Sequence, residues 1–159
     1  MAKYYLDSSA LTKRYKRTES GSNFVSNLFS GGHQLFYLNL AIIEVRKVFY
    51  RLRHHPQSIE GDVQTSDADF QLAQNQFAAD LQQMQRVVLT EEMISNTETI
   101  LQNHWLKSAF DLAHLSAFLI TRQEHPDIIL VSADGPMCDV ARQLVSTTDV
   151  INPEEQEKV

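Results

Sequence analysis

The chain has 159 residues, of which 43% are hydrophobic and 21% charged, as expected for one globular domain. Cys138 is the single cysteine, which excludes an internal disulfide and fits a reducing compartment. The sequence shows no secretory leader pattern and no apolar run near the roughly 20 residues that span a bilayer. We therefore expect a cytoplasmic protein of one domain, with no membrane segment.

The net charge of −6 is unevenly distributed along the chain. Residues 1–53 carry nine basic groups against three acids, whereas residues 54–159 carry five against 17. The overall negative charge argues against nucleic-acid binding, because contacts to phosphates depend on Lys and Arg. The basic N-terminal third nevertheless indicates a surface that faces a polyanion, with ordinary solvated helix faces as the alternative.

The predicted elements alternate between strands and helices. Strands are expected at 3–6, 34–37, 87–89, 128–132 and 149–151. Helices are expected from a cap at Ser8 or Ser9 to 15, at 20–30 and 40–53, from 67 to about 84, and at 91–102, 110–122 and 134–144. Residues 54–66 lack apolar periodicity and contain Pro56 and Gly61, which predicts a loop.

The strands read as unbroken apolar runs, most clearly IILVS at residues 128–132. Such strands are typical of a parallel sheet that is covered on both faces. We therefore predict an α/β fold, a three-layer α/β/α sandwich around a central parallel sheet of four or five strands. One domain is expected over 1–153, followed by a C-terminal tail at 154–159.

Four acids stand out by position. Asp7 ends the first strand and Asp134 follows the strand 128–132, and ligands of such sheets bind at the carboxyl ends of the strands. Glu44 and Asp111 lie in apolar helical surroundings, where an unpartnered carboxylate costs several kcal/mol. A hard divalent cation would remove the repulsion among gathered carboxylates and could activate water for attack on phosphorus.

Each acid also has a structural explanation. Asp7 and Asp134 could be helix N-caps, Asp111 could cap its helix, and Glu44 could pair with a Lys or Arg of a neighbouring element. His114 lies three residues after Asp111 on the same helix face. It either orients that acid or is a satisfied core histidine.

Several segments together resemble a known family. In chain order these are YYLDSSALTKRY (4–15), LAIIEVRKVFYR (40–51), HWLKSAFDLAHLSAFL (104–119), ILVSADGPMCDVA (129–141) and VINP (150–153). They resemble the motifs of the PIN domain, in particular its VapC-type toxin branch, over nearly the whole chain. Two features depart from the family: Phe110 stands where a smaller residue is expected, and the loop 54–66 is long.

The resemblance implies an Mg²⁺- or Mn²⁺-dependent endoribonuclease, the toxin of a type II toxin–antitoxin pair. Asp7, Glu44, Asp111 and Asp134 would be the catalytic acids and metal ligands. Ser9 and Ser132 would be supporting hydroxyls, and Asp139 is a doubtful match to an extra acid. The implied partners are an RNA substrate, a small antitoxin protein and a second copy of the chain.

The basic residues suggest a path for RNA. We expect some of them to line an RNA-binding path that leads to the four acids, with Tyr15 or Tyr50 available for base stacking. The candidates for RNA binding are Lys13, Arg14, Arg17, Arg46 and Arg51. The alternative is that these are solvated helix faces.

Other functions remain open on the sequence alone. A PIN nuclease of RNA processing would need no antitoxin, and an interaction protein could keep the fold without turnover. A phosphatase of the haloacid dehalogenase type needs a second Asp where this chain has Ser9. A phosphoacceptor receiver domain requires paired acids at the first strand and a lysine at the end of a late strand. At the late strand this chain has Ser132 and Asp134 instead.

Overall fold

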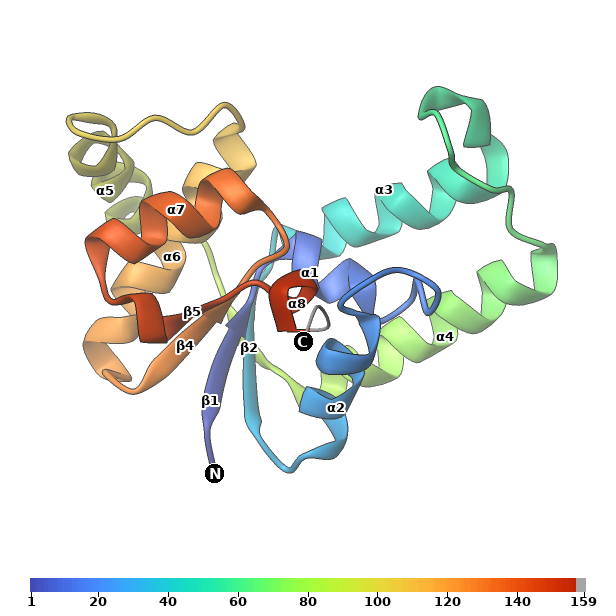
Figure 1. Ribbon diagram of the computed structural model, residues 1–159, viewed down its shortest axis with the longest axis horizontal. Helices are drawn as coiled ribbons and strands as arrows, with labels where there is room; N and C mark the ends of the chain where they lie inside the picture. The colour runs from blue at the N-terminus through green and yellow to red at the C-terminus, as the bar shows by residue number, and fades with distance from the viewer. Residues whose placement is uncertain (157–159) are drawn as a thin grey trace.

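The computed structural model describes residues 1–156, and they contain one sheet of five parallel strands (Figure 1). The strands are β1 (Lys3–Leu6), β2 (Gln34–Leu38), β3 (Gln85–Val87), β4 (Ile128–Val131) and β5 (Val150–Ile151), in the order β3-β2-β1-β4-β5. The predicted α/β sandwich with a central parallel sheet is confirmed. Residues 157–159, which end the expected C-terminal tail, lie outside the described residues.

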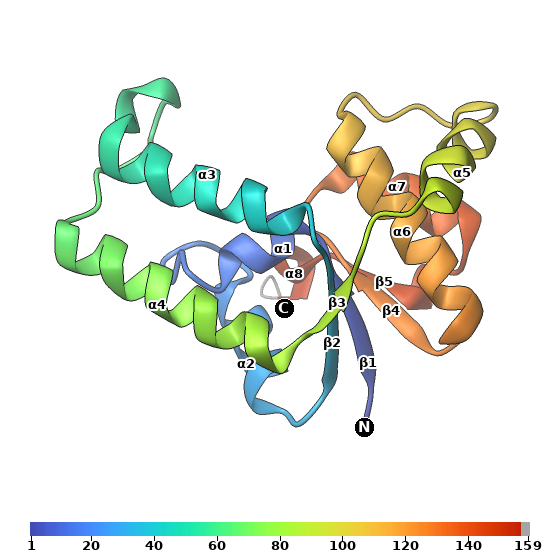
Figure 2. The ribbon, with the colours of Figure 1, turned by 180° about the vertical axis from the view of Figure 1, so that it is seen from behind.

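Helices cover both faces of the sheet (Figure 2). They are α1 (Ser8–Lys13), α2 (Ser22–Ser30), α3 (Ala41–His54), α4 (Asp67–Gln83), α5 (Glu91–Leu101), α6 (Ala109–Glu124), α7 (Gly135–Leu144) and α8 (Pro153–Gln156). Short 3₁₀ turns stand at Pro56–Ser58 and Thr147–Asp149. No helix within 1–156 combines the length and the apolarity needed to cross a membrane.

The alternation of side chains along each strand divides the core into two layers. On β1, Tyr5 packs with the buried residues of α5, α6 and α7, whereas Leu6 packs with those of α1 to α4. Leu130 and Val131 divide in the same way on β4. Because both faces are apolar, the strands have no polar alternation, and this is why they read as unbroken runs in the sequence.

Helices α3 and α4 form a long hairpin that extends away from the sheet, and the segment at its tip, 55–66, begins one residue later than the predicted loop 54–66 (Figure 1). Aromatic rings hold its base: Tyr15, Phe49 and Phe77 meet edge to face, with ring centroids 5.3–5.8 Å apart. Arg51 reaches the tip loop through an ion pair of 2.7 Å with Asp62.

Two local predictions were wrong in detail, and one further helix was not predicted. The third strand is 85–87 and not 87–89; the amide of Leu89 instead donates to Oδ1 of Asn39 at 3.1 Å. The N-cap of α1 is Asp7 and not Ser8 or Ser9, because its carboxylate accepts from the Ala10 amide. The chain also forms a short helix, α8, after β5.

Candidate active site

The sheet order places the site at the junction of β1 and β4. The chain adds β2 and β3 on one side of β1, and later adds β4 and β5 on the other side. Ligands of parallel α/β sheets bind at such a switch point, outside the carboxyl ends of the strands. Asp7 follows β1 there, and its amide donates to the Val131 carbonyl at the end of β4, at 3.1 Å.

Asp7 is the most deeply held acid, with 1% of its surface exposed. Its Oδ1 accepts from the Ala10 amide at 2.8 Å, its Oδ2 accepts from Ser132 Oγ at 2.7 Å, and Ser9 Oγ lies within 2.9 Å of both oxygens. Three donors leave about one of the four carboxylate lone-pair sites for another ligand. Burial raises the pKa of Asp7, although His114 and these hydrogen bonds act against the rise.

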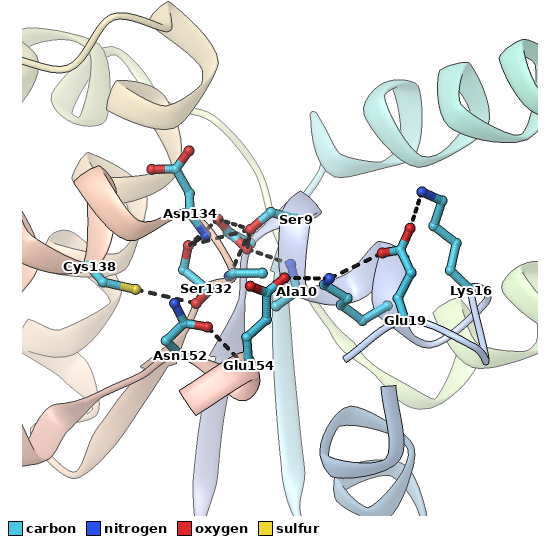
Figure 3. Close-up of polar contacts among 12 residues, drawn as sticks. Ser9, Ala10, Lys16, Glu19, Ser132, Asp134, Cys138, Asn152 and Glu154 are labelled. Carbon is cyan, nitrogen blue, oxygen red and sulfur yellow. Dashed lines mark hydrogen bonds and ion pairs between the residues drawn. The ribbon is translucent and has the colours of Figure 1, made fainter. Parts of the chain in front are cut away.

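Ser9 and Ser132 connect Asp7 to the loop that follows β4, and Figure 3 shows the two serines beside Asp134. Each gives its hydroxyl hydrogen to Asp7 and accepts an amide: Ser9 from Ala133 at 2.9 Å and Ser132 from Asp134 at 3.1 Å. The two hydroxyls expected to support the site therefore do contact its first acid. Whether they support catalysis stays a prediction.

Glu44 lies in the first turn of α3 and is bound at both oxygens. His114 Nε2 lies 2.6 Å from Oε1, and Ser8 Oγ donates to Oε2 at 2.7 Å. His114 is fully buried, and its Nδ1 has no hydrogen-bond partner within residues 1–156, which assigns the ring hydrogen to Nε2. Glu44 thus pairs with a histidine and not with the Lys or Arg considered from sequence.

Sequence reasoning missed these two partners. Ser8 received no role beyond a candidate cap, and His114 was weighed as a partner of Asp111 instead of Glu44. A signal existed for Ser8, because consecutive helix residues point about 100° apart and Ser8 and Ser9 therefore face different neighbours. No sequence pattern links His114 to Glu44, because the two residues are 70 positions apart in the chain.

Asp111 and Asp134 complete the acidic group. Asp111 is half-buried in the first turn of α6, and its pKa is raised to about 6 by burial and then by the charges of Asp134, Asp7 and Glu44. Asp134 caps α7 by accepting from the Met137 amide at 2.7 Å. Asp111 therefore lies close enough to the other three predicted acids for their charges to raise its pKa.

All four acids also stand at helix N-termini. Asp7 and Asp134 are the N-caps of α1 and α7, whereas Glu44 and Asp111 lie in the first turns of α3 and α6. A helix N-terminus carries partial positive charge, which stabilises a nearby carboxylate. Capping is thus confirmed for Asp7 and Asp134, whereas α6 is capped by Ser108, which accepts from the Asp111 amide, and not by Asp111.

The donor set fits a hard divalent cation in its chemistry, because the acids offer only oxygen ligands. As the side chains stand, no group of three or more His, Cys, Asp or Glu residues in the described part of the chain is arranged to hold a metal. Oxygens of Asp7, Glu44 and Asp134 instead accept hydrogen bonds from the donors named above. Asp139 points elsewhere, with 73% of its side chain exposed beside Arg142.

A cavity of about 390 Å³ opens beside Glu44, between α1, α3 and α6. Ser8, Ser9, Glu19 and Glu44 line it, together with the cations Lys16, Lys47 and Arg51 and the apolar side chains Ile43 and Phe110. Lys16 is paired with Glu19 and Arg51 with Asp62. Lys47 is therefore the lining cation that has no ion pair within residues 1–156.

The residues predicted to bind RNA fall into two groups. Lys13, Arg14 and Arg51 are engaged in ion pairs, with Glu19 and Glu154, with Asp80, and with Asp62 respectively. Arg17 and Arg46 are exposed and form no ion pair within residues 1–156. The second group, together with Lys47, is therefore freer to meet phosphates.

The two tyrosines considered for base stacking are engaged elsewhere. Tyr15 donates to Asp80 at 2.9 Å and packs between the rings of Phe49 and Phe77. Tyr50 is half exposed, but it packs edge-on against Phe70 and does not line the cavity.

Comparison with known proteins supports the fold. No family model and no curated protein sequence matches the chain. Among solved structures it resembles a chain of VapBC2 from Rickettsia felis, a structure determined with VapBC2 bound to a DNA fragment from the promoter. The TM-score is 0.57 with 9% identity, over 94% of this chain and 98% of that chain. At this identity the likeness shows a shared α/β fold, of the kind expected from the PIN resemblance.

Proposed function

We propose that this chain is a metal-dependent endoribonuclease that hydrolyses RNA at the acidic edge of its sheet. The observation that carries the proposal is that Asp7, Glu44, Asp111 and Asp134 lie at the N-termini of four helices, with Asp7 and Asp134 just after β1 and β4. The raised pKa of Asp111 supports it, because that rise includes repulsion from the other three acids. A cluster of mutually repelling carboxylates is suited to a divalent cation.

These four acids would hold Mg²⁺ or Mn²⁺, in exchange for some of their present hydrogen bonds. When bound, the ion would supply an activated water and stabilise the charge that develops on the phosphate. Ser9 and Ser132 fix Asp7 in place while leaving it an open acceptor site. Ser8 and His114 do the same for Glu44 from two different helices.

The surroundings favour a polymeric anion as substrate. Lys47 lines the cavity beside Glu44 and has no ion pair within residues 1–156, and the exposed Arg17 and Arg46 add unpaired positive charge. The phosphatase and the receiver domain are less well supported, because both need a second acid near Asp7. Ser9 stands at that position and donates a hydrogen bond to Asp7. RNA fits the cations and the carboxylates together.

We further propose that the protein acts in the cytoplasm as the toxin of a type II pair, with a small antitoxin and as a homodimer. The support is the fold that this chain shares with a chain of VapBC2, because the name VapBC2 denotes two components. Purification from its native host separates this role from a free-standing RNA-processing nuclease. A small partner that co-purifies stoichiometrically supports the toxin, and its absence contradicts that part of the proposal.

A cleavage assay on fluorescent RNA tests the activity. Wild-type protein and Asp139→Asn, whose altered acid is exposed away from the site, should cleave with Mg²⁺ or Mn²⁺ and stop with EDTA. Asp7→Asn should be inactive in every condition. Cleavage that persists in both EDTA and Asp7→Asn would indicate a contaminant and contradict the proposal.

A further inference from the structure

Two exposed apolar side chains flank the acidic site. Phe110 directly precedes Asp111 in the first turn of α6, and Ile43 directly precedes Glu44 in the first turn of α3. Phe110 is 46% exposed and Ile43 61% exposed, and both line the cavity of about 390 Å³. Since consecutive helix residues point about 100° apart, each apolar side chain lies beside its acid and not behind it.

This exposure calls for an explanation. Other large apolar residues of α6, such as Leu115 and Phe118, are fully buried against the sheet. An aromatic ring left open in a cavity beside charged groups marks a place where a ligand replaces water. Phe110 is also the residue that departs from the smaller one expected at this point of the PIN motif.

The rest of the cavity indicates the chemistry of the occupant. Lys16, Lys47 and Arg51 line the same space, but Lys16 is paired with Glu19, which also lines it, and Arg51 is paired with Asp62. Lys47 is exposed and has no ion pair in the described part of the chain, so it remains available to an anion. An aromatic face and cations within one cavity match a nucleotide, whose base is flat and apolar and whose phosphate is anionic.

Other exposed aromatic residues fit this role less well. Trp105 is 77% exposed on the segment between α5 and α6, but it does not line the cavity. Tyr15 and Tyr50, as shown above, pack against other aromatic rings. Phe110 is the aromatic residue that lines the cavity together with Glu44 and the serines of α1.

We propose that Phe110, with Ile43 in the same cavity, is a stacking platform that selects the base next to the phosphate to be cleaved. A base inside a duplex cannot offer its face to a side chain, so the platform acts on an unpaired base. This inference rests on the proposed function and assigns Phe110 a role in its specificity.

Binding in a cleavage-deficient background tests the platform. Asp7→Asn protein would be titrated with single-stranded RNAs that carry 2-aminopurine at successive positions. Phe110 should quench the probe at one position, where it stacks. Adding Phe110→Ala or Phe110→Leu should abolish that quenching and weaken binding by about 5- to 100-fold, the range for loss of one stacked base.

Two further variants separate stacking from general disturbance. Phe110→Trp retains an aromatic face and should restore both quenching and affinity, whereas Trp105→Ala removes an exposed aromatic residue outside the cavity and should change neither. The half-exposed Phe110 contributes little to the core, so urea unfolding of Phe110→Ala should agree with the parent within about 1 kcal/mol.

Specific results would overturn the inference. Equal affinity and equal quenching in Phe110→Ala and the parent would exclude stacking, and would leave the apolar pair as a contact for a protein partner. Normal behaviour of Phe110→Leu would show that apolar bulk and not an aromatic face is required. If the wild type cleaves RNA and is insensitive to Phe110, only this inference fails. If it cleaves no RNA with Mg²⁺ or Mn²⁺, the proposed function itself fails.

Discussion

The imidazole Nε2 of His114 lies 2.6 Å from Oε1 of Glu44, and this contact joins the two helical layers at the edge of the sheet. His114 belongs to α6, which packs on one face with α5 and α7, whereas Glu44 belongs to α3 on the other face. Ser8 of α1 binds the second oxygen of Glu44. One carboxylate therefore receives hydrogen bonds from both layers, and its position depends on the assembled fold.

Loss of the His114–Glu44 contact should lower the free energy of unfolding more than loss of the Ser8–Glu44 hydrogen bond. His114→Ala leaves a cavity in the core and a less satisfied carboxylate, so we expect a loss of about 2–4 kcal/mol in the free energy of unfolding. Ser8→Ala removes one hydrogen bond and should cost about 1 kcal/mol. Urea titrations measure both values, and a smaller loss for His114→Ala than for Ser8→Ala would contradict the described packing.

Asp111 predicts a pH dependence of stability in metal-free protein. Its pKa in the folded state is about 6, against an ordinary value of 3.8, so folding favours its protonated form. The stabilising contribution is therefore complete below about pH 4 and is lost as the pH rises through 6. Asp111→Asn cannot ionise, and it should be more stable than wild type at pH 7.5 by about 1 kcal/mol, a value reduced for solvent screening.

Unfolding at pH 4 and at pH 7.5 checks this prediction. The advantage of Asp111→Asn should appear at the higher pH and vanish at the lower one. Asp139→Asn, an exposed acid on α7, should show no such change. If the stability advantage of Asp111→Asn over wild type were larger at pH 4 than at pH 7.5, the prediction would be contradicted.

Asp80 is a structural acid at the base of the α3–α4 hairpin. It is buried on α4, where it accepts from Arg14 Nε at 3.1 Å and from the Tyr15 hydroxyl at 2.9 Å. Asp80→Ala leaves a guanidinium without its partner and should destabilise the protein by about 3–5 kcal/mol. Gln82→Ala, exposed on the same helix, should stay within about 0.5 kcal/mol. Equal stability of the two variants by urea unfolding would show that this cluster does not hold the hairpin.

RNA affinity should depend on the cations without ion pairs. Arg46→Ala combined with Lys47→Ala removes two exposed charges of α3, so binding should weaken and its salt dependence should flatten, by about 0.7 in slope per lost phosphate contact. Lys3→Ala is the control, since Lys3 pairs with Asp127 at the opposite end of β1. Anisotropy titrations at several salt concentrations give the slopes, and an unchanged slope in the double variant would exclude this surface.

The sheet and the edge of the site were accessible to sequence reasoning because their signals are local. An unbroken run such as IILVS at 128–132 indicates a strand buried on both faces, and the acid after such a strand must lie at its carboxyl end. Asp7 and Asp134 were placed correctly for this reason. Glu44 and Asp111 stood out by their apolar surroundings, and the PIN resemblance was needed to assign them to the same site as Asp7 and Asp134.

The partners of charged groups were not accessible, because they come from distant parts of the chain. Lys13 pairs with Glu154, 141 positions away, and Arg14 pairs with Asp80, 66 positions away. In the sequence these cations look identical to Arg46, which stays exposed. Only the packing of α1 against α4 and α8 decides which cations are structural and which can meet a substrate.

The most direct test of the shared acidic site is Mn²⁺ binding, followed by electron paramagnetic resonance. The measurement compares wild type with Asp7→Asn, Glu44→Gln, Asp111→Asn, Asp134→Asn and the control Asp139→Asn. We predict that wild type and the control bind Mn²⁺ alike, and that each of the four site variants binds about tenfold more weakly or worse. Wild-type protein that binds no Mn²⁺, or binding that survives all four substitutions unchanged, would contradict a metal site built from these carboxylates.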